Sequence, residues 1–418
     1  MYKLKIFGGS KLNGEVRISG SKNSSLPILF ASILASDEIH IKNTPHLSDV
    51  STTLRLLMEM GSEFMLESDN SIVINSSSLK SLEAKYDLVK TMRASILALG
   101  PTLAKYGKAK VSLPGGCAIG SRPVNLHLKA LEELGAKIEV KAGYIYAEAK
   151  ELIGTKIYFD QRSVTATENI LMAATLAKGN TTIYNAAQEP EVSDLINCLN
   201  AMGAKITGFG TSTLEIEGVD DLSGVSYSVC PDRIEAGTYL LAGAITRGKI
   251  TVKNVKPESM RSTIGKLIET GAHISSTSDS ITLDMKDERP KAVDIKTGAY
   301  PNFPTDMQAQ FTALNAVASG SSIITETIFE NRFMHIPELI RMGADLNLDG
   351  HTVFCKGVKY LNGANLMATD LRASASLVLA GLVAEGKTVI DRVYHLDRGY
   401  ETIEEKLKIL GANIERVQ

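Results

Sequence analysis

Two kinds of helix-forming segment alternate along the chain. The first kind is apolar on nearly all sides, as in Leu26 to Ala35 and Ser374 to Val383, and such helices are expected to be buried. The second kind is amphipathic and ends in a glycine, as in Leu128 to Ala136. A glycine directly after the last apolar position is typical of a left-handed helix cap. The pattern therefore predicts buried helices alternating with helices that face solvent.

This alternation forms an internal repeat. A β-branched segment follows each apolar helix, and one or two further strands follow each amphipathic helix, such as Ser71 to Ile74 and Ser280 to Leu283. The closing glycines recur at intervals of roughly 70 residues, as expected for a repeat architecture. They are Gly61, Gly135, Gly203, Gly271, Gly343 and Gly411. Each of the six units reads βαβαββ, and an apolar helix surrounded by sheets and outer helices is the inverse of a barrel with its helices outside.

The number of units and the length of the chain predict two lobes. A chain of 418 residues exceeds one hydrophobic core, so we expect three units in each lobe. The N-terminal lobe is predicted to span residues 21–229, and the C-terminal, catalytic lobe to combine residues 1–20 with 230–418.

The first 20 residues precede the first apolar helix. Their pattern predicts a hairpin with strands from Tyr2 to Phe7 and from Gly14 to Ile18, joined by a turn at Gly8-Gly9. We expect this hairpin to close the last unit.

Composition excludes several classes of partner. The chain is 44% hydrophobic and 22% charged with a net charge of −2, and it has no polybasic run for nucleic acid or membrane binding. No apolar run is long enough to span a bilayer, and the N-terminus lacks the apolar core of a signal peptide. The four cysteines are scattered, and no Cys/His spacing indicates zinc. We expect a cytoplasmic protein with reduced thiols and neither metal nor cofactor.

A glycine-rich segment, PGGCAIGSRP from Pro114 to Pro123, lies in the second unit. Three glycines allow the backbone to approach a ligand closely. Cys117 lies near both an arginine and a helix start, which is a setting that favours a reactive thiolate. The segment is therefore a candidate catalytic loop in the N-terminal lobe, and a surface loop with an incidental cysteine is the alternative.

Charged residues lie where the buried helices begin. Helix N-termini attract anions, so converging helix starts with basic side chains predict an anion site. Asp306 is an acid among bases, as expected for a general base. Ordinary helix capping is the alternative at each position. The residues concerned are Lys22, Arg93, Glu168, Asp232, Arg233, Asp306, Asp370 and Arg372.

Two further arginines occupy equivalent positions. Arg332 and Arg398 follow the second strand of their units, in the connection that contains Arg122 in the second unit. Arginine suits bidentate contacts with carboxylate or phosphate. Structural salt bridges are the alternative.

These motifs resemble the enolpyruvyl transferases over the whole chain. The matching stretches are GSKN (20–23), TMRAS (91–95), LPGGCAIGSRPV (113–124), FPTDMQAQ (303–310), FENRFMH (329–335) and DRGY (397–400). The resemblance implies the family's α/β fold, a two-lobed inside-out barrel of six βαβαββ units. It also implies transfer of the enolpyruvyl group of phosphoenolpyruvate, with release of phosphate.

Cys117 and the GSKN motif favour the members that use UDP-N-acetylglucosamine. Those members modify its 3′-hydroxyl in the first committed step of peptidoglycan synthesis. The resemblance further implies a tetrahedral ketal intermediate, a fosfomycin-sensitive Cys117 that donates a proton, and Asp306 as the base. We expect no nucleic acid or membrane partner, and a monomer.

The resemblance implies three sets of site residues. The expected catalytic residues are Cys117, Asp306, Lys22 and Arg398. The residues expected to bind phosphoenolpyruvate are Lys22, Asn23, Arg122, Arg332, Arg372 and Arg398. Those expected to bind UDP-N-acetylglucosamine are Arg93, Arg122, Pro123, Val124, Asn125, Leu126, Gln161, Arg162, Ser163, Val164, Asp306 and Ile328.

The sequence departs from the family pattern at a few of these positions. Asn125 stands where Asp is common, Gln161 and Arg162 replace a Lys-Val pair, and Thr165 replaces a glycine. These changes concern the UDP-sugar contacts. Two alternative functions remain: 5-enolpyruvylshikimate-3-phosphate synthase, and a catalytically silent repeat scaffold that binds a nucleotide sugar.

Overall fold

The computed structural model describes residues 2–114 and 124–418. The predictions for Cys117, Arg122 and Pro123 lie outside these residues. The described chain divides into two compact units. The C-terminal unit combines the residues up to Ser19 with Pro231–Gln418, and the N-terminal unit contains the described residues from Gly20 to Cys230.

Each unit contains three four-stranded sheets, so the predicted α/β fold with six repeats is confirmed. The sheets of the N-terminal unit have the orders β14-β3-β5-β4, β6-β7-β9-β8 and β10-β11-β13-β12. Their strands are β3 (Ile39–Lys42), β4 (Glu63–Leu66), β5 (Ile72–Asn75), β6 (Glu83–Ala84), β7 (Lys108–Ser112), β8 (Lys137–Lys141), β9 (Tyr144–Glu148), β10 (Lys156–Tyr158), β11 (Asn180–Tyr184), β12 (Lys205–Thr207), β13 (Thr213–Glu217) and β14 (Ser226–Ser228).

The sheets of the C-terminal unit have the orders β16-β17-β15-β2, β18-β19-β21-β20 and β22-β23-β1-β24. Their strands are β1 (Lys3–Phe7), β2 (Asn13–Arg17), β15 (Lys249–Lys253), β16 (His273–Ser276), β17 (Ser280–Asp284), β18 (Ile295–Lys296), β19 (Ser321–Thr325), β20 (Asp345–Asp349), β21 (Thr352–Lys356), β22 (Asn365–Met367), β23 (Lys387–Asp391) and β24 (Asn413–Val417).

The helices divide into inner and outer sets, as predicted. The inner helices are α1 (Lys22–Ala31), α4 (Leu99–Tyr106), α6 (Val164–Ala174), α8 (Arg233–Ile245), α10 (Gln308–Val317) and α12 (Leu371–Val383). The outer helices are α2 (Ser48–Met60), α5 (Asn125–Glu133), α7 (Pro190–Ala201), α9 (Arg261–Glu269), α11 (Ile336–Arg341) and α13 (Ile403–Ile409). The short helices are η1 (Ser32–Leu34), α3 (Tyr86–Val89), η2 (Arg93–Ala98), η3 (Pro257–Met260), η4 (Thr305–Met307) and η5 (Val393–Arg398).

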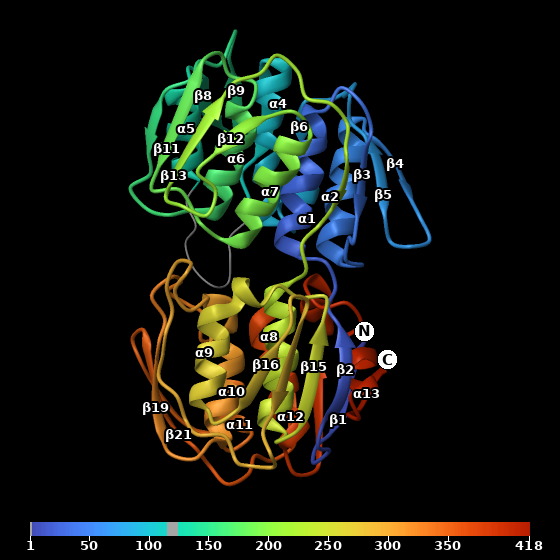
Figure 1. The fold of residues 1–418 in the computed structure, drawn as a ribbon, viewed down its shortest axis with the longest axis vertical. Coiled ribbons are helices and arrows are strands. Elements are labelled where there is room, and N and C mark those ends of the chain that lie inside the picture. Colours follow the sequence, from blue (N-terminus) through green and yellow to red (C-terminus); the bar gives the residue numbers. More distant parts are fainter. Residues whose placement is uncertain (1, 115–123) are drawn as a thin grey trace. The chain divides into compact units, whose positions relative to one another are not determined.

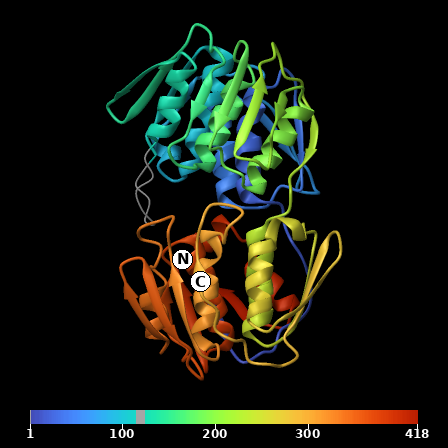
Figure 2. The same cartoon turned by 60° about the vertical axis from the view of Figure 1, so that its left-hand side comes forward.

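The inner helices form the core of each unit (Figure 1). Every residue of α8 after Arg233 is buried, whereas α2 buries one face through residues such as Val50, Leu54 and Leu57. Helices α8, α10 and α12 contact one another, and the sheets of each unit lie outside its inner helices in both views (Figures 1 and 2). The six closing glycines all have left-handed φ values between 93° and 114°, which confirms the predicted helix caps.

The predicted N-terminal hairpin is wrong. Strand β1 pairs antiparallel with both β23 and β24, so it does close the last unit, but β2 pairs parallel with β15 in another sheet. The burial pattern gives the physical reason. Leu4 and Ile6 of β1 are completely buried, as expected for a central strand, whereas Val16 is the one buried residue of the edge strand β2. Strand β14 occupies the corresponding edge in the N-terminal unit, where it pairs parallel with β3.

Candidate active site

Ordinary capping accounts for four of the six inner-helix starts. Ser21 caps α1, Ser163 caps α6, Asp232 caps α8 and Asp370 caps α12, each by accepting a backbone N–H bond. The two acids among these caps are therefore explained by helix formation. Asp306 differs, because it lies within the short helix η4 before α10, whose N-cap is Pro304.

Asp306 instead binds two arginines of the C-terminal unit. Its Oδ1 lies 2.5 Å from Arg332 Nη2, and its Oδ2 lies 3.5 Å from Arg372 Nη2. The side chains of Arg332 and Arg372 are only 8% and 3% exposed, whereas that of Asp306 is 26% exposed. The structure thus brings together three predicted site residues, and the Asp306 carboxylate remains accessible from solvent.

Two hydroxyl groups accept further hydrogen bonds from these arginines. Arg332 Nη1 donates a hydrogen bond of 2.9 Å to Thr305 Oγ1, and Arg372 Nη1 donates one of 3.2 Å to the Tyr400 hydroxyl. Burial raises the pKa of Tyr400, so this residue is a neutral acceptor. The guanidinium of Arg372 also lies 5.5 Å from the centre of the Tyr400 ring, within reach of a cation–π interaction.

The remaining predicted residues of this unit lie in the expected connections. Arg398 is the last residue of η5, between β23 and α13, and it is half-buried. Ile328 follows β19, and its N–H donates a hydrogen bond of 2.8 Å to Glu326 Oε1. Thr305 and Glu326 were not predicted as site residues. Each looks like an ordinary strand-end or helix-start residue in the sequence, so no local signal marks them.

Lys22 and Asn23 begin α1 in the N-terminal unit. Lys22 Nζ lies 3.2 Å from Asp49 Oδ2, and both side chains are largely buried. Asp49 also was not predicted, because an acid in the first turn of an amphipathic helix is usually assigned to the helix dipole. The buried ion pair holds the lysine at the start of α1.

A buried neutral network joins the first turns of α5 and α6. Asn169 Nδ2 donates to His127 Nδ1 at 2.9 Å, and Asn169 Oδ1 accepts from the Gly100 N–H at 2.7 Å. His127 Nε2 therefore carries the ring proton and lies 3.3 Å from Thr165 Oγ1. Burial, assisted by the charge of Arg93, lowers the pKa of His127 to about 3, so the ring stays neutral.

Four of the predicted UDP-sugar residues adjoin this network in sequence. Asn125 and Leu126 lie in the first turn of α5, Val124 precedes them, and Val164 begins α6. They lie next to His127 and Thr165 in sequence. The network thus connects the two segments that the resemblance assigns to the nucleotide sugar.

Other predicted residues of this unit lie at its surface or in helix starts. Gln161 is exposed, and the exposed Arg162 donates to Asn185 Oδ1 at 3.2 Å. Arg93 is the first residue of η2. Glu168 is buried inside α6 rather than placed at its start, and burial, together with Glu191 and Glu189, raises its pKa well above the usual value.

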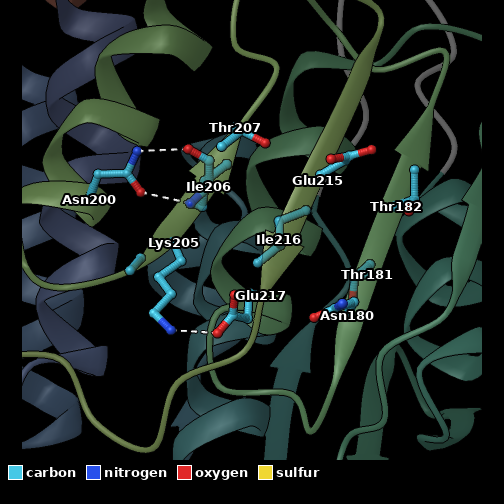
Figure 3. A pocket seen from close by; sticks show the side chains of 11 residues that line it. Asn180, Thr181, Thr182, Asn200, Lys205, Ile206, Thr207, Glu215, Ile216 and Glu217 are labelled. Atoms are coloured by element: carbon cyan, nitrogen blue, oxygen red, sulfur yellow. Dashed lines mark hydrogen bonds and ion pairs between the residues drawn. The ribbon is translucent and has the colours of Figure 1, made fainter.

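A cavity of about 440 Å³ lies elsewhere in the N-terminal unit, beside β11, β12, β13 and the end of α7 (Figure 3). Asn200 binds both the N–H and the carbonyl of Ile206, each at 2.9 Å, and Lys205 pairs with Glu217. These groups satisfy one another, and no predicted site residue lines the cavity.

The described residues contain no cluster of three or more His, Cys, Asp or Glu side chains able to hold a metal ion. Among the helices of residues 2–114 and 124–418, none combines the length and apolar character needed to cross a membrane.

Comparison with known proteins identifies relatives over the full chain. The family model of EPSP synthase (3-phosphoshikimate 1-carboxyvinyltransferase) matches residues 6–407. A UDP-N-acetylglucosamine 1-carboxyvinyltransferase from Ruthia magnifica subsp. Calyptogena magnifica is 76% identical over 418 residues, which cover 100% of both chains.

Solved structures with the same fold also match the full chain. The crystal structure of the enolpyruvyl transferase NikO from Streptomyces tendae is 26% identical with a TM-score of 0.89, and the match covers 100% of this chain and 99% of NikO. EPSP synthase from Acinetobacter baumannii is 18% identical with a TM-score of 0.78 over 100% of both chains, and it shares the fold.

Proposed function

Because the chain belongs to the enolpyruvyl transferases, the family of EPSP synthase and UDP-N-acetylglucosamine 1-carboxyvinyltransferase, we propose that it transfers the enolpyruvyl group of phosphoenolpyruvate to the 3′-hydroxyl of UDP-N-acetylglucosamine. Phosphate is the second product, and the reaction commits the sugar to peptidoglycan synthesis. The observation that carries this proposal is the partly exposed carboxylate of Asp306 between two buried arginines. The full-length relative with 76% identity supports this acceptor over shikimate 3-phosphate.

In the proposed reaction, cations bind the donor substrate. Arg332 and Arg372, together with Lys22, Asn23, Arg122 and Arg398, bind the phosphate and carboxylate of phosphoenolpyruvate. Charged donors that are fixed before the reaction stabilise charge that develops in the transition state. The buried, hydrogen-bonded guanidinium groups of Arg332 and Arg372 meet this requirement.

Addition and elimination then follow. Asp306 accepts the proton of the 3′-hydroxyl while the oxygen of that hydroxyl attacks C2 of phosphoenolpyruvate. Cys117 delivers a proton to the methylene carbon C3. The product of this step is a tetrahedral ketal. Loss of a proton from C3 and departure of phosphate from C2 restore the double bond, so that all atoms balance. Lys22 and Arg398 offset the charge on the leaving phosphate.

The acceptor binds through the remaining predicted residues. They are Arg93, Arg122, Pro123, Val124, Asn125, Leu126, Gln161, Arg162, Ser163, Val164 and Ile328. Since both substrates are soluble cytoplasmic metabolites, we also assign the protein to the cytoplasm, and we propose that it acts as a monomer.

A phosphate-release assay tests the proposal. The protein is incubated with phosphoenolpyruvate and either UDP-N-acetylglucosamine or shikimate 3-phosphate. We expect phosphate release with the UDP-sugar alone. Release with shikimate 3-phosphate alone would favour the alternative synthase, and release with neither acceptor would favour a silent scaffold.

A further inference from the structure

Glu326 is a buried carboxylate with no role in the reaction proposed above. It follows β19 directly and is 1% exposed. Its Oε1 accepts hydrogen bonds from Thr297 Oγ1 at 2.8 Å, from the Ile328 N–H at 2.8 Å and from the Phe329 N–H at 3.3 Å. Its Oε2 accepts one from Thr305 Oγ1 at 2.8 Å. A buried charge is costly unless such bonds satisfy it.

The two oxygens of Glu326 serve different parts of the unit. Oε1 belongs to a local hydrogen-bond network. In this network Thr297 Oγ1 also accepts from the Thr327 N–H at 2.8 Å, and the Thr297 carbonyl accepts from Thr327 Oγ1 at 2.7 Å. These bonds hold the ends of β18 and β19 together. Oε2 instead reaches η4, the short helix that contains Asp306.

The hydroxyl of Thr305 transmits this contact to Arg332. A guanidinium donates hydrogen bonds and cannot accept them, so the Thr305 proton points away from Arg332 and to Glu326 Oε2. A lone pair of Thr305 Oγ1 then faces Arg332 Nη1 at 2.9 Å, and Arg332 Nη2 binds Asp306. The chain of bonds therefore runs from Glu326 through Thr305 to Arg332 and Asp306.

We propose that Glu326, acting through the Thr305 hydroxyl, is a positioning residue that directs the Arg332 guanidinium toward the anionic donor substrate. The inference rests on the proposed function, in which Arg332 binds phosphoenolpyruvate. The two oxygens of Glu326 have different roles in this proposal: Oε1 maintains the fold near Ile328, and Oε2 orients the Arg332 guanidinium.

The experiment compares matched variants in the phosphate-release assay. Thr305→Val keeps the shape of the side chain and removes the hydroxyl. We expect the KM for phosphoenolpyruvate to rise about tenfold or more, because a hydrogen bond to a charged group is lost. The KM for UDP-N-acetylglucosamine should change less than about twofold, since the Oε1 bonds remain. Thr305→Ser restores the hydroxyl and should return the KM for phosphoenolpyruvate to within about threefold of wild type.

Thr297→Val is the matched control. It removes one bond to Oε1 of the same carboxylate and the bond from the Thr327 N–H, and it leaves the bond between Oε2 and Thr305 in place. We expect a lower melting temperature and an unchanged KM for phosphoenolpyruvate. Equal rises in this KM for Thr305→Val and Thr297→Val would overturn the inference, as would a wild-type KM in Thr305→Val.

Glu326→Gln decides the question if Thr305→Val does not fold. Its amide oxygen can replace Oε1, whereas its NH2 group donates to Thr305 and reverses the hydroxyl. The same rise in the KM for phosphoenolpyruvate is expected, and a wild-type value would overturn the inference. A wild-type protein that releases no phosphate with both substrates would instead refute the proposed function.

Discussion

Two buried polar groups, one in each unit, differ in their charge. In the N-terminal unit, His127 and Asn169 form a neutral network that also binds the backbone of Gly100 and Ile96. In the C-terminal unit, Asp306, Arg332 and Arg372 form a charged group. The same repeat architecture therefore supports both a neutral polar network and a buried group of three charged side chains.

The difference separates what the fold requires from what a ligand requires. The neutral network satisfies backbone groups and needs nothing further. Two buried guanidinium groups bind the same carboxylate, and Arg332 Nε has no hydrogen-bond partner among the described residues. Burial of charge without compensation is unfavourable, so the ionic group is suited to an anionic ligand.

Replacement of Asp306 by Asn should have the largest effect on this contrast. Asparagine keeps the shape of the side chain but is a very poor proton acceptor, so we expect kcat to fall about 10²- to 10⁴-fold, the usual contribution of a general base. UDP-N-acetylglucosamine should still bind. Phosphate release measures the first effect, and titration calorimetry with the UDP-sugar measures the second.

Asp345→Asn is the control for this prediction, because Asp345 is exposed at the start of β20. It should leave both measurements unchanged. A kcat close to wild type in Asp306→Asn would remove this carboxylate from the mechanism.

The sequence predicts much of the fold because burial requires particular patterns. Helices that are apolar on all sides must lie inside, and a glycine must follow each amphipathic helix, so six repeats are visible without the structure. The N-terminal hairpin was wrong for an equally physical reason. The alternation of Leu4 and Ile6 shows which face of β1 is buried, but it does not show which strands lie beside it.

The site was predictable in its charges but not in its contacts. Asp306 is recognisable in the sequence as a candidate base, yet its partners Arg332 and Arg372 come 26 and 66 residues later. Thr305 and Tyr400 orient these arginines through contacts 27 and 28 residues apart in sequence. Such contacts depend on how the repeats pack, and no local pattern encodes them.

The neutral network predicts an acid sensitivity that comes from the N-terminal unit. Folded His127 takes up a proton near its lowered pKa of about 3, whereas the unfolded chain does so near the ordinary histidine pKa of 6.5. Between these values the unfolded state binds more protons, so stability rises with pH and is lost as the pH falls. The expected contribution is about 1.4 kcal/mol per pH unit.

Urea unfolding at pH 4, 5 and 6 measures this contribution. His127→Gln has no titrating ring, so its free energy of unfolding should fall less steeply on acidification than that of wild type. The exposed His273 in β16 provides the control, and His273→Gln should keep the wild-type slope. Equal slopes in wild type and His127→Gln would show that this histidine is not held neutral.

Tyr400→Phe should have a smaller effect, and it tests the charged group from its other side. Phenylalanine keeps an aromatic ring beside Arg372 but removes the hydroxyl that accepts from Arg372 Nη1. The Tyr400 hydroxyl also lies 2.9 Å from Thr238 Oγ1. Thr238 keeps its hydrogen bond to the Ile234 carbonyl, at 2.8 Å, when the Tyr400 hydroxyl is removed. We expect the KM for phosphoenolpyruvate to rise about tenfold, in line with the loss of one bond to a charged group.

The matched control is Tyr227→Phe in the N-terminal unit, where the hydroxyl donates to Asp194 Oδ1 at 2.7 Å. This substitution removes a similar hydrogen bond from the N-terminal unit, whereas Arg332 and Arg372 belong to the C-terminal unit. It should lower the melting temperature and leave the KM for phosphoenolpyruvate unchanged. If both tyrosine variants raise this KM equally, the hydroxyl of Tyr400 acts through general stability. A rise in this KM for Tyr400→Phe alone would show that the Tyr400 hydroxyl orients Arg372 for an anionic substrate. The Tyr227 hydroxyl in the N-terminal unit would then have no such role.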